Sequence, residues 1–177
     1  RGMDMALADI AAARDLARIT WNAETIATRR PPYQAFGAAR VVPPPGAFLQ
    51  ATAHGEAALL AAVTEAVGPA RRIADLFAGC GTFALPLAAR AEVHAVEGDR
   101  AMLAALDTGW RKADGLRRVT HEARDLFRNP LLPEDLARFD AVVIDPPRAG
   151  AEAQVAALAA AGIPRIAMVS CNPVTFA

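Results

Sequence analysis

The chain has 177 residues, and its 19 basic and 19 acidic side chains balance to zero net charge. This length suits one domain, or one domain and part of another. Zero net charge excludes a strongly basic nucleic-acid coat, although not a local basic patch. Two cysteines, Cys80 and Cys171, exclude a disulfide framework or an all-cysteine metal site within the chain. No uncharged apolar run reaches 18 residues and no signal-peptide pattern is present, so we expect a soluble cytoplasmic protein.

The first 70 residues predict a helix, a strand, a proline-rich stretch and a second helix. Residues 5–17 have apolar side chains three and four positions apart, which favours a helix, and residues 18–30 alternate weakly, which favours a short strand. No helix crosses the prolines of residues 31–45, so we expect a linker or an extended crossing segment there. Residues 52–67 predict a helix that ends at a Gly-Pro stop signal.

From residue 71 onward, short apolar runs alternate with helical patterns. The predicted strands are 72–78, 92–97, 119–124, 141–145 and 165–170. The predicted helices are 82–90, 99–113, 133–138 and 151–161. Repeated strand–helix–strand units connect through right-handed crossovers. The sequence therefore predicts an α/β, Rossmann-like fold with a mostly parallel twisted sheet and helices on both faces.

A glycine-rich loop lies between the first of these strands and the helix that follows it. It runs from Asp75 to Ala84 and contains the pattern G-x-G-x-x-A, which permits a tight turn and close approach of a ligand to the backbone. Glu97 ends the next strand 18 positions after Gly79, close to the spacing of about 20 at which a carboxylate binds ribose hydroxyls. A solvated strand-end acid is the alternative. Asp125, after the third strand, is either a contact to an adenine edge or a helix N-cap.

The charge near this loop distinguishes two nucleotide ligands. Asp75 lies four residues before Gly79 and would add negative charge beside the pyrophosphate of a dinucleotide. S-adenosylmethionine instead brings an ammonium and a sulfonium, which a carboxylate attracts. We therefore expect a methyl donor rather than a dinucleotide.

The fourth and fifth strands end in polar residues stiffened by proline, at the edge where open α/β sheets bind ligands. The fourth ends in Asp145-Pro-Pro-Arg148. Enzymes that methylate exocyclic amines commonly have an aromatic residue in the Arg148 position, so this arginine argues against that reaction. Cys171 follows an apolar run beside an expected helix start, which predicts an exposed nucleophile rather than a buried small hydrophobe. Cys80 is interpreted as a small filler, and three scattered histidines predict no metal site.

Five segments, in this order, resemble the RNA uracil-C5 methyltransferases. They are FLQA (48–51), DLFAGCGTFALPLA (75–88), VEGD (96–99), DPPRAG (145–150) and VSCNPVTFA (169–177). The resemblance covers residues 46–177 and implies a class I methyltransferase fold that uses S-adenosylmethionine. The D-L-F start of the glycine loop is more similar to the branch that acts on 23S ribosomal RNA than to the transfer-RNA branch. We therefore expect ribosomal RNA as the partner, with no membrane and no metal.

The resemblance also implies roles for individual residues. Cys171 would be the nucleophile that adds to C6 of uracil, and Arg148 would order the site or the RNA. Thr82 stands where the family has Asn, so it retains a polar oxygen but lacks the amide. The residues that would contact S-adenosylmethionine or hold the methyl-transfer site are Gln50, Phe77, Gly79, Thr82, Glu97 and Asp145.

The same resemblance sets the expected domain organisation. Residues 1–40 would be the remnant of a preceding domain with its proline-rich linker. Residues 41–177 would be the S-adenosylmethionine-binding domain, incomplete after the fifth of about seven strands. The family's proton-abstracting Glu lies downstream, so we expect this piece alone to be inactive. The alternatives are a transfer-RNA enzyme, an amine-directed or other methyltransferase, a donor-binding module without activity, and a dehydrogenase.

Overall fold

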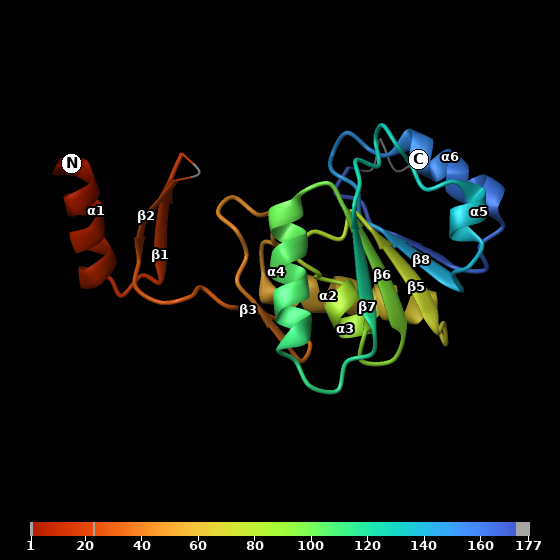
Figure 1. Ribbon diagram of the computed structural model, residues 1–177, viewed down its shortest axis with the longest axis horizontal. Coiled ribbons are helices and arrows are strands. Elements are labelled where there is room, and N and C mark those ends of the chain that lie inside the picture. Colours follow the sequence, from red (N-terminus) through yellow and green to blue (C-terminus); the bar gives the residue numbers. More distant parts are fainter. Residues whose placement is uncertain (1, 23, 173–177) are drawn as a thin grey trace.

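A five-stranded parallel sheet forms the centre of the protein in the computed structural model, which describes residues 2–22 and 24–172 (Figure 1). Its strands are β5 (Arg72–Leu76), β6 (Glu92–Glu97), β7 (Val119–Ala123), β8 (Ala141–Ile144) and β9 (Ile166–Met168). All five match the predicted strands to within two residues at either end. They pair in the order β7-β6-β5-β8-β9, so the order reverses between β5 and β8. The predicted α/β fold is confirmed.

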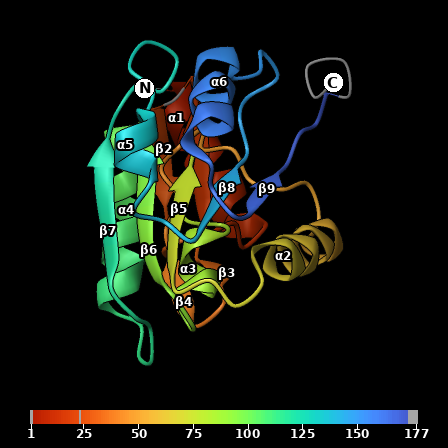
Figure 2. The same ribbon diagram turned by 90° about the vertical axis from the view of Figure 1, so that its right-hand side faces the viewer.

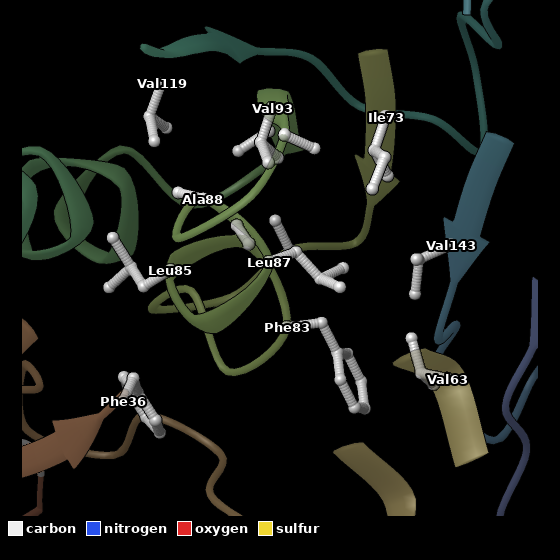
Figure 3. Packing of buried hydrophobic residues seen from close by; sticks show 14 of the residues in the cluster. Phe36, Val63, Ile73, Phe83, Leu85, Leu87, Ala88, Val93, Val119 and Val143 are labelled. Carbon is white, nitrogen blue, oxygen red and sulfur yellow. The ribbon is translucent and has the colours of Figure 1, made fainter. Parts of the chain in front are cut away.

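Helices cover both faces of this sheet (Figures 1 and 2). One face carries α2 (Ala53–Val67), α3 (Ala84–Leu87) and α4 (Arg100–Arg111); the other carries α5 (Pro133–Leu136) and α6 (Glu152–Ala161). Successive strand residues point to opposite faces. Ile73 and Val143 therefore pack under the first group of helices (Figure 3), whereas Ala74 and Val142 pack under the second. This double burial explains why the strands are continuous apolar runs. Among the residues that the structure describes, no helix has the length and apolar character to span a bilayer.

Local signals in the sequence place the helix ends. The Thr52 Oγ1 caps α2 by accepting a hydrogen bond from the Gly55 N–H at 3.0 Å, and α2 ends at Gly68, whose φ is +55°. Asp99 caps α4 through the Ala101 N–H at 2.7 Å. The helix predicted over 82–90 is shorter than expected, since only the four residues of α3 are α-helical. Pro86 lies within α3 and has no backbone N–H to donate.

The N-terminal segment forms a separate small unit at one end of the molecule (Figure 1). It contains α1 (Gly2–Ala13), β1 (Arg18–Trp21) and β2 (Glu24–Thr28), and the two strands pair antiparallel. The prediction of one short strand over 18–30 was therefore wrong. Asn22, with φ of +46°, begins the turn that reverses the chain, and Asn adopts this conformation more readily than most residues.

The proline-rich stretch contains a second antiparallel pair, β3 (Gln34–Phe36) and β4 (Ala39–Val41). The expectation of a linker or extended segment missed this pair. Its side chains join the core cluster under α4, where Phe36 and Val41 are 1% exposed. A Cβ on Gly109 of α4 would lie 2.6 Å from a methyl group of Val41, so glycine permits this close packing.

Candidate functional site

A cavity of about 840 Å³ opens at the carboxyl edge of the sheet, where the strand order reverses between β5 and β8. Open α/β sheets bind their ligands at this position. Its lining includes all eight residues that the sequence predicted for the site, namely Gln50, Phe77, Gly79, Thr82, Glu97, Asp145, Arg148 and Cys171. The structure therefore brings together residues that are separated by up to 121 positions in the chain.

The glycine loop forms the floor of this cavity and has an unusual backbone. Phe77 has φ of +61°, a left-handed conformation that an aromatic residue rarely adopts, and this turn ends β5 two residues before the predicted end. Gly79 and Gly81 have φ of +55° and +96°. A Cβ on Gly79 would meet no atom within 4 Å, whereas one on Gly81 would lie 2.8 Å from Leu85. Gly79 thus leaves ligand space open, and Gly81 allows the loop to pack on α3.

Glu97 connects the end of β6 to the glycine loop. Its Oε2 accepts a hydrogen bond from the Gly79 N–H at 3.0 Å, and its Oε1 accepts one from the Asp99 N–H at 2.9 Å. Both oxygens retain acceptor capacity, because an ionised carboxylate has about four lone-pair sites. The carboxylate therefore lies at the loop, in position to accept hydrogen bonds from ligand hydroxyls.

Asp75 places a carboxyl group in the core directly behind the loop. It is fully buried, and neither of its oxygens has a hydrogen-bond partner within the described chain. Burial, with smaller effects from Asp145 and Glu97, raises the pKa of Asp75 to about 8. The Ala84 N–H opposes part of this rise, although it does not meet the geometry of a hydrogen bond.

Asp145 adds a third carboxyl group to the same region, and burial raises its pKa as well. Asp75, Glu97 and Asp145 thus place three carboxyl groups at the cavity floor or directly behind it. The raised pKa values of Asp75 and Asp145 beside a cavity are typical of a site that binds a positively charged group.

The segment that follows β9 carries the predicted nucleophile. Cys171 is exposed and lines the cavity. Its neighbours hold the backbone in a tight turn, since Ser170 Oγ donates to the Asn172 carbonyl at 3.0 Å and the Asn172 N–H donates to Ser170 Oγ at 3.1 Å. The helix start that we expected after Cys171, and residues 173–177 of the last sequence motif, lie outside the described residues.

The segment that follows β8 lies beside the Cys171 turn. The Asn172 side-chain amide donates to the Arg148 carbonyl at 3.4 Å, which joins the two segments. Within the first segment, the Gly150 N–H donates to the Pro147 carbonyl at 2.8 Å and closes a turn. Asp145 is half-buried, whereas Arg148 is exposed. The turn therefore directs an acid toward the cavity floor and an arginine toward its mouth.

Two exposed aromatic residues of the cavity lining were not predicted as site residues. Phe48 is 72% exposed, and Phe127 is 49% exposed with its ring centroid 5.3 Å from that of Phe77. Aromatic surface at the cavity rim can stack on a planar ligand. The sequence signal that could have identified Phe127 is an aromatic residue two positions after the strand-end acid Asp125.

The two alternatives for Asp125 are both compatible with its position. Its Oδ1 accepts hydrogen bonds from the backbone N–H groups of Phe127 and Arg128 at 3.0 and 3.3 Å, which is the capping geometry, and it also lines the cavity. Cys80, in contrast, is 1% exposed, and burial together with Asp99 and Glu97 raises its pKa to about 11. A thiol in this environment stays protonated and unreactive.

The chain is similar to proteins that are named as RNA methyltransferases. A sequence profile of the tRNA (uracil-5-)-methyltransferase family matches residues 43–177. A protein of Mesorhizobium japonicum named as an uncharacterized RNA methyltransferase is 54% identical over 93% of this chain and 40% of its own length. A 23S rRNA (uracil(1939)-C(5))-methyltransferase of Chromohalobacter salexigens is 40% identical over 75% of this chain and 28% of its own length.

Among solved structures, the chain is similar to the tRNA (uracil-54, C5)-methyltransferase of Pyrococcus abyssi in complex with S-adenosyl-L-homocysteine. The TM-score is 0.67 at 26% sequence identity, over 81% of this chain and 35% of that one. The chain spans about 40% of the length of curated relatives that are 54% and 53% identical to it.

Proposed function

The chain belongs to the tRNA (uracil-5-)-methyltransferase family, and from this membership we propose that it is the methyl-donor-binding part of an enzyme that methylates C5 of a uridine in RNA. The observation that carries the proposal is the cavity itself. It brings the exposed thiol of Cys171 together with the glycine loop and the carboxyl groups of Glu97 and Asp145, with the buried carboxyl group of Asp75 behind the loop. An enzyme that adds a thiol to a base beside a positively charged methyl donor needs these groups in one place.

The residues of the cavity floor fit S-adenosylmethionine. Asp75, whose carboxyl group has no hydrogen-bond partner among the described residues, and the nearby Asp145 would attract its positive charges. Glu97 would accept hydrogen bonds from its ribose hydroxyls. Gly79 leaves the space through which the ligand approaches the backbone. Gln50, Phe77 and Thr82 would complete the contacts. When bound, this group supplies an electrophilic methyl carbon beside the target base.

Cys171 would supply the nucleophile of the reaction. As a thiolate, its Sγ forms a bond to C6 of uracil, and the electron pair of the C5–C6 double bond moves to C5 and O4 as an enolate. This makes C5 nucleophilic enough to take a methyl group. A base, which we place downstream of residue 177, then removes the C5 proton. The electron pair restores the double bond and expels the thiolate.

The target uridine must leave its stack before its C6 can reach Cys171. The cavity volume of about 840 Å³ lies near the upper end of the usual range for ligand sites, so it can hold a nucleoside donor and an extruded base. Arg148 at the cavity mouth is exposed, and its charge would hold the RNA or order the site.

We further propose 23S ribosomal RNA as the substrate, with transfer RNA as the alternative. The D-L-F start of the glycine loop supports this choice, and so does the 40% identity to an enzyme named for 23S rRNA. Methylation of purified 23S rRNA and of purified transfer RNA by the full-length gene product, compared side by side, tests it. Incorporation of 5-methyluridine only into transfer RNA would contradict it.

The covalent mechanism is tested with Cys171→Ala in the full-length protein. We expect at least a thousandfold loss of methyl transfer, because the base then lacks its activating nucleophile. Wild-type protein should form a gel-stable adduct with RNA that contains 5-fluorouridine, whose C5 has no proton to remove. Cys80→Ala is the matched control and should form the adduct, since Cys80 does not line the cavity.

Three results would contradict this proposal. They are methyl transfer by Cys171→Ala, an N-methylated product, and the absence of an adduct with wild-type protein. Calorimetry with S-adenosylhomocysteine separates a further possibility, because tight binding without any turnover would indicate a donor-binding module.

A further inference from the structure

The amino edge of the sheet, opposite the cavity, carries a cluster of arginines. Arginine lies at or just before the start of β5, β7, β8 and β9, at positions 71, 72, 117, 118, 138 and 165. Backbone hydrogen bonds place these residues along one edge. The carbonyls of Arg72, Arg118 and Arg165 accept from the N–H groups of residues 140, 93 and 142 at 2.8, 3.0 and 3.0 Å.

Three of these arginines converge on one hollow of about 380 Å³. Arg72, Arg118 and Arg138 reach it from β5, β7 and the segment before β8. The rest of the lining is formed by Glu92, Val93, His94, Thr120 and Phe139. The lining of the hollow thus contains three arginines and one acidic residue, Glu92.

The nearby acid Asp140 neutralises these arginines poorly. Its Oδ2 already accepts hydrogen bonds from the backbone N–H groups of Arg71 and Arg72 at 3.0 and 2.9 Å, and these bonds hold its pKa below the usual value. Its approach to the Arg72 guanidinium is loose, at 3.7 Å. Arg118 and Arg138 have no carboxylate within 4 Å in the described part of the chain.

The position of β7 connects this hollow with the cavity. β7 is an edge strand of the described sheet. It connects Arg118, which lines the hollow, to Arg124, which lines the cavity. Five residues at about 3.3 Å each separate the two edges by about 17 Å. A stacked strand rises about 3.4 Å per nucleotide, so about five nucleotides cover this distance, and a stacked strand of six nucleotides centred on the cavity ends short of the hollow.

We propose that the hollow formed by Arg72, Arg118 and Arg138 binds backbone phosphates of the RNA whose uridine enters the cavity. Exposed arginines suit this ligand, because the planar guanidinium matches phosphate in a bidentate manner and phosphate contacts carry no sequence information. The inference rests on the proposed function.

The test compares two double variants of the full-length protein. Arg118→Gln/Arg138→Gln removes two charges from the hollow, and Arg14→Gln/Arg100→Gln removes two from positions that line neither the hollow nor the cavity. The probes are a labelled RNA hairpin of 20 base pairs and a single strand of six nucleotides. Dissociation constants are measured by fluorescence anisotropy between 50 and 300 mM KCl.

We expect the hollow variant to flatten the plot of log affinity against log salt for the hairpin by about 1.5, since each lost phosphate contact changes the slope by roughly 0.7 to 0.9. The six-nucleotide strand should show no change, and neither probe should respond to the control variant. Arg118→Lys/Arg138→Lys retains both charges and should restore the slope. This variant is also the control for the lost contact between the Arg138 guanidinium and the Phe139 ring, whose centroid lies 4.9 Å away, because lysine retains the charge without the guanidinium plane.

Equal salt slopes in the hollow and control variants would overturn the inference. A lower melting temperature of the hollow variant with an unchanged slope would also overturn it, and would indicate that another part of the full-length chain covers the hollow. The proposed function fails separately, through absence of the 5-fluorouridine adduct. The hairpin slope needs no methyl transfer, so the two failures are distinguishable.

Discussion

Asp75 is the residue at which stability and ligand binding oppose each other. Its carboxyl group has a pKa of about 8 in the folded protein, against an ordinary value of 3.8. Between those two values the unfolded chain is ionised while the folded one holds a proton. The free energy of unfolding that depends on Asp75 therefore falls as pH rises from about 4 to about 8. A bound cation would relieve this penalty, so the residue favours the ligand-bound state.

We expect Asp75→Asn to raise the free energy of unfolding of the ligand-free protein at pH 8 by about 1 to 3 kcal/mol. Each unit of raised pKa corresponds to about 1.4 kcal/mol, and the buried amide retains part of the penalty. The advantage over wild type should shrink as pH approaches 4. The same variant should bind S-adenosylhomocysteine more weakly. Urea denaturation at several pH values, with calorimetry, measures both.

Asp140→Asn is the matched control with the opposite sign. The backbone N–H groups of Arg71 and Arg72 hold the pKa of Asp140 below its ordinary value. The stability that Asp140 contributes is therefore fully present above its pKa in the unfolded chain, and it is lost as pH falls through its pKa in the folded protein. This variant should lower stability at pH 7 and converge with wild type in acid. An Asp75→Asn variant that is less stable than wild type at pH 8 would show that the buried carboxylate has a partner.

At the scale of elements, the loop between β5 and α3 combines two glycines with different tasks. Gly79 has open space beside it and lines the cavity, whereas Gly81 is packed against Leu85. The loop therefore separates binding from folding within three residues. Its strained neighbour Phe77, held at positive φ, fixes where β5 ends.

Alanine substitutions separate these tasks. Gly81→Ala should reduce stability by about 2 to 4 kcal/mol, because its Cβ would overlap the Leu85 side chain and its φ of +96° disfavours any side chain. Gly79→Ala should cost about 1 to 2 kcal/mol, from its left-handed backbone alone, yet weaken S-adenosylhomocysteine binding at least tenfold. Thermal denaturation and calorimetry measure the two effects. Equal loss of stability in both variants would contradict this division.

At the scale of the whole molecule, charge is sorted across the sheet. Acids gather at the carboxyl edge around Asp75, Glu97 and Asp145, and exposed arginines gather at the amino edge. Zero net charge thus hides a polarity in which one edge suits a positively charged donor and the other suits phosphate. Neither composition nor motif spacing indicates this separation, because it depends on which strand ends meet.

The division of the chain into domains is a whole-molecule question that limited proteolysis tests. Arg29 follows β2 in an irregular segment, whereas Arg40 lies in β4, whose neighbours Ala39 and Val41 are buried against the core. Trypsin should therefore cleave early after Arg29, and Arg40 should resist, because local opening is rarer where side chains are packed. Sequencing the N-terminus of the stable product decides the matter. A product that begins at Val41 would support the boundary that the sequence suggested.

The strands of the sheet were predictable because each is a short apolar run bounded by breakers, and the glycine loop was predictable because its pattern has a fixed place after a strand. The pair β3–β4 was not, since three-residue strands carry too little periodicity and the prolines around them indicate extended chain. Phe127 and the arginine edge were missed because single exposed residues carry no local signal of their neighbours.

By itself, the sequence determined the α/β fold, the order of the motifs and the residue types of the candidate site, because local apolar patterns and short polar motifs depend on neighbours along the chain. Only the tertiary structure decided that Gln50, Glu97 and Cys171 face one cavity and that Arg72, Arg118 and Arg138 share one hollow. It also decided that Asp75 has no hydrogen-bond partner in the part of the chain that the structure describes. These properties depend on the strand order β7-β6-β5-β8-β9, which brings distant segments side by side.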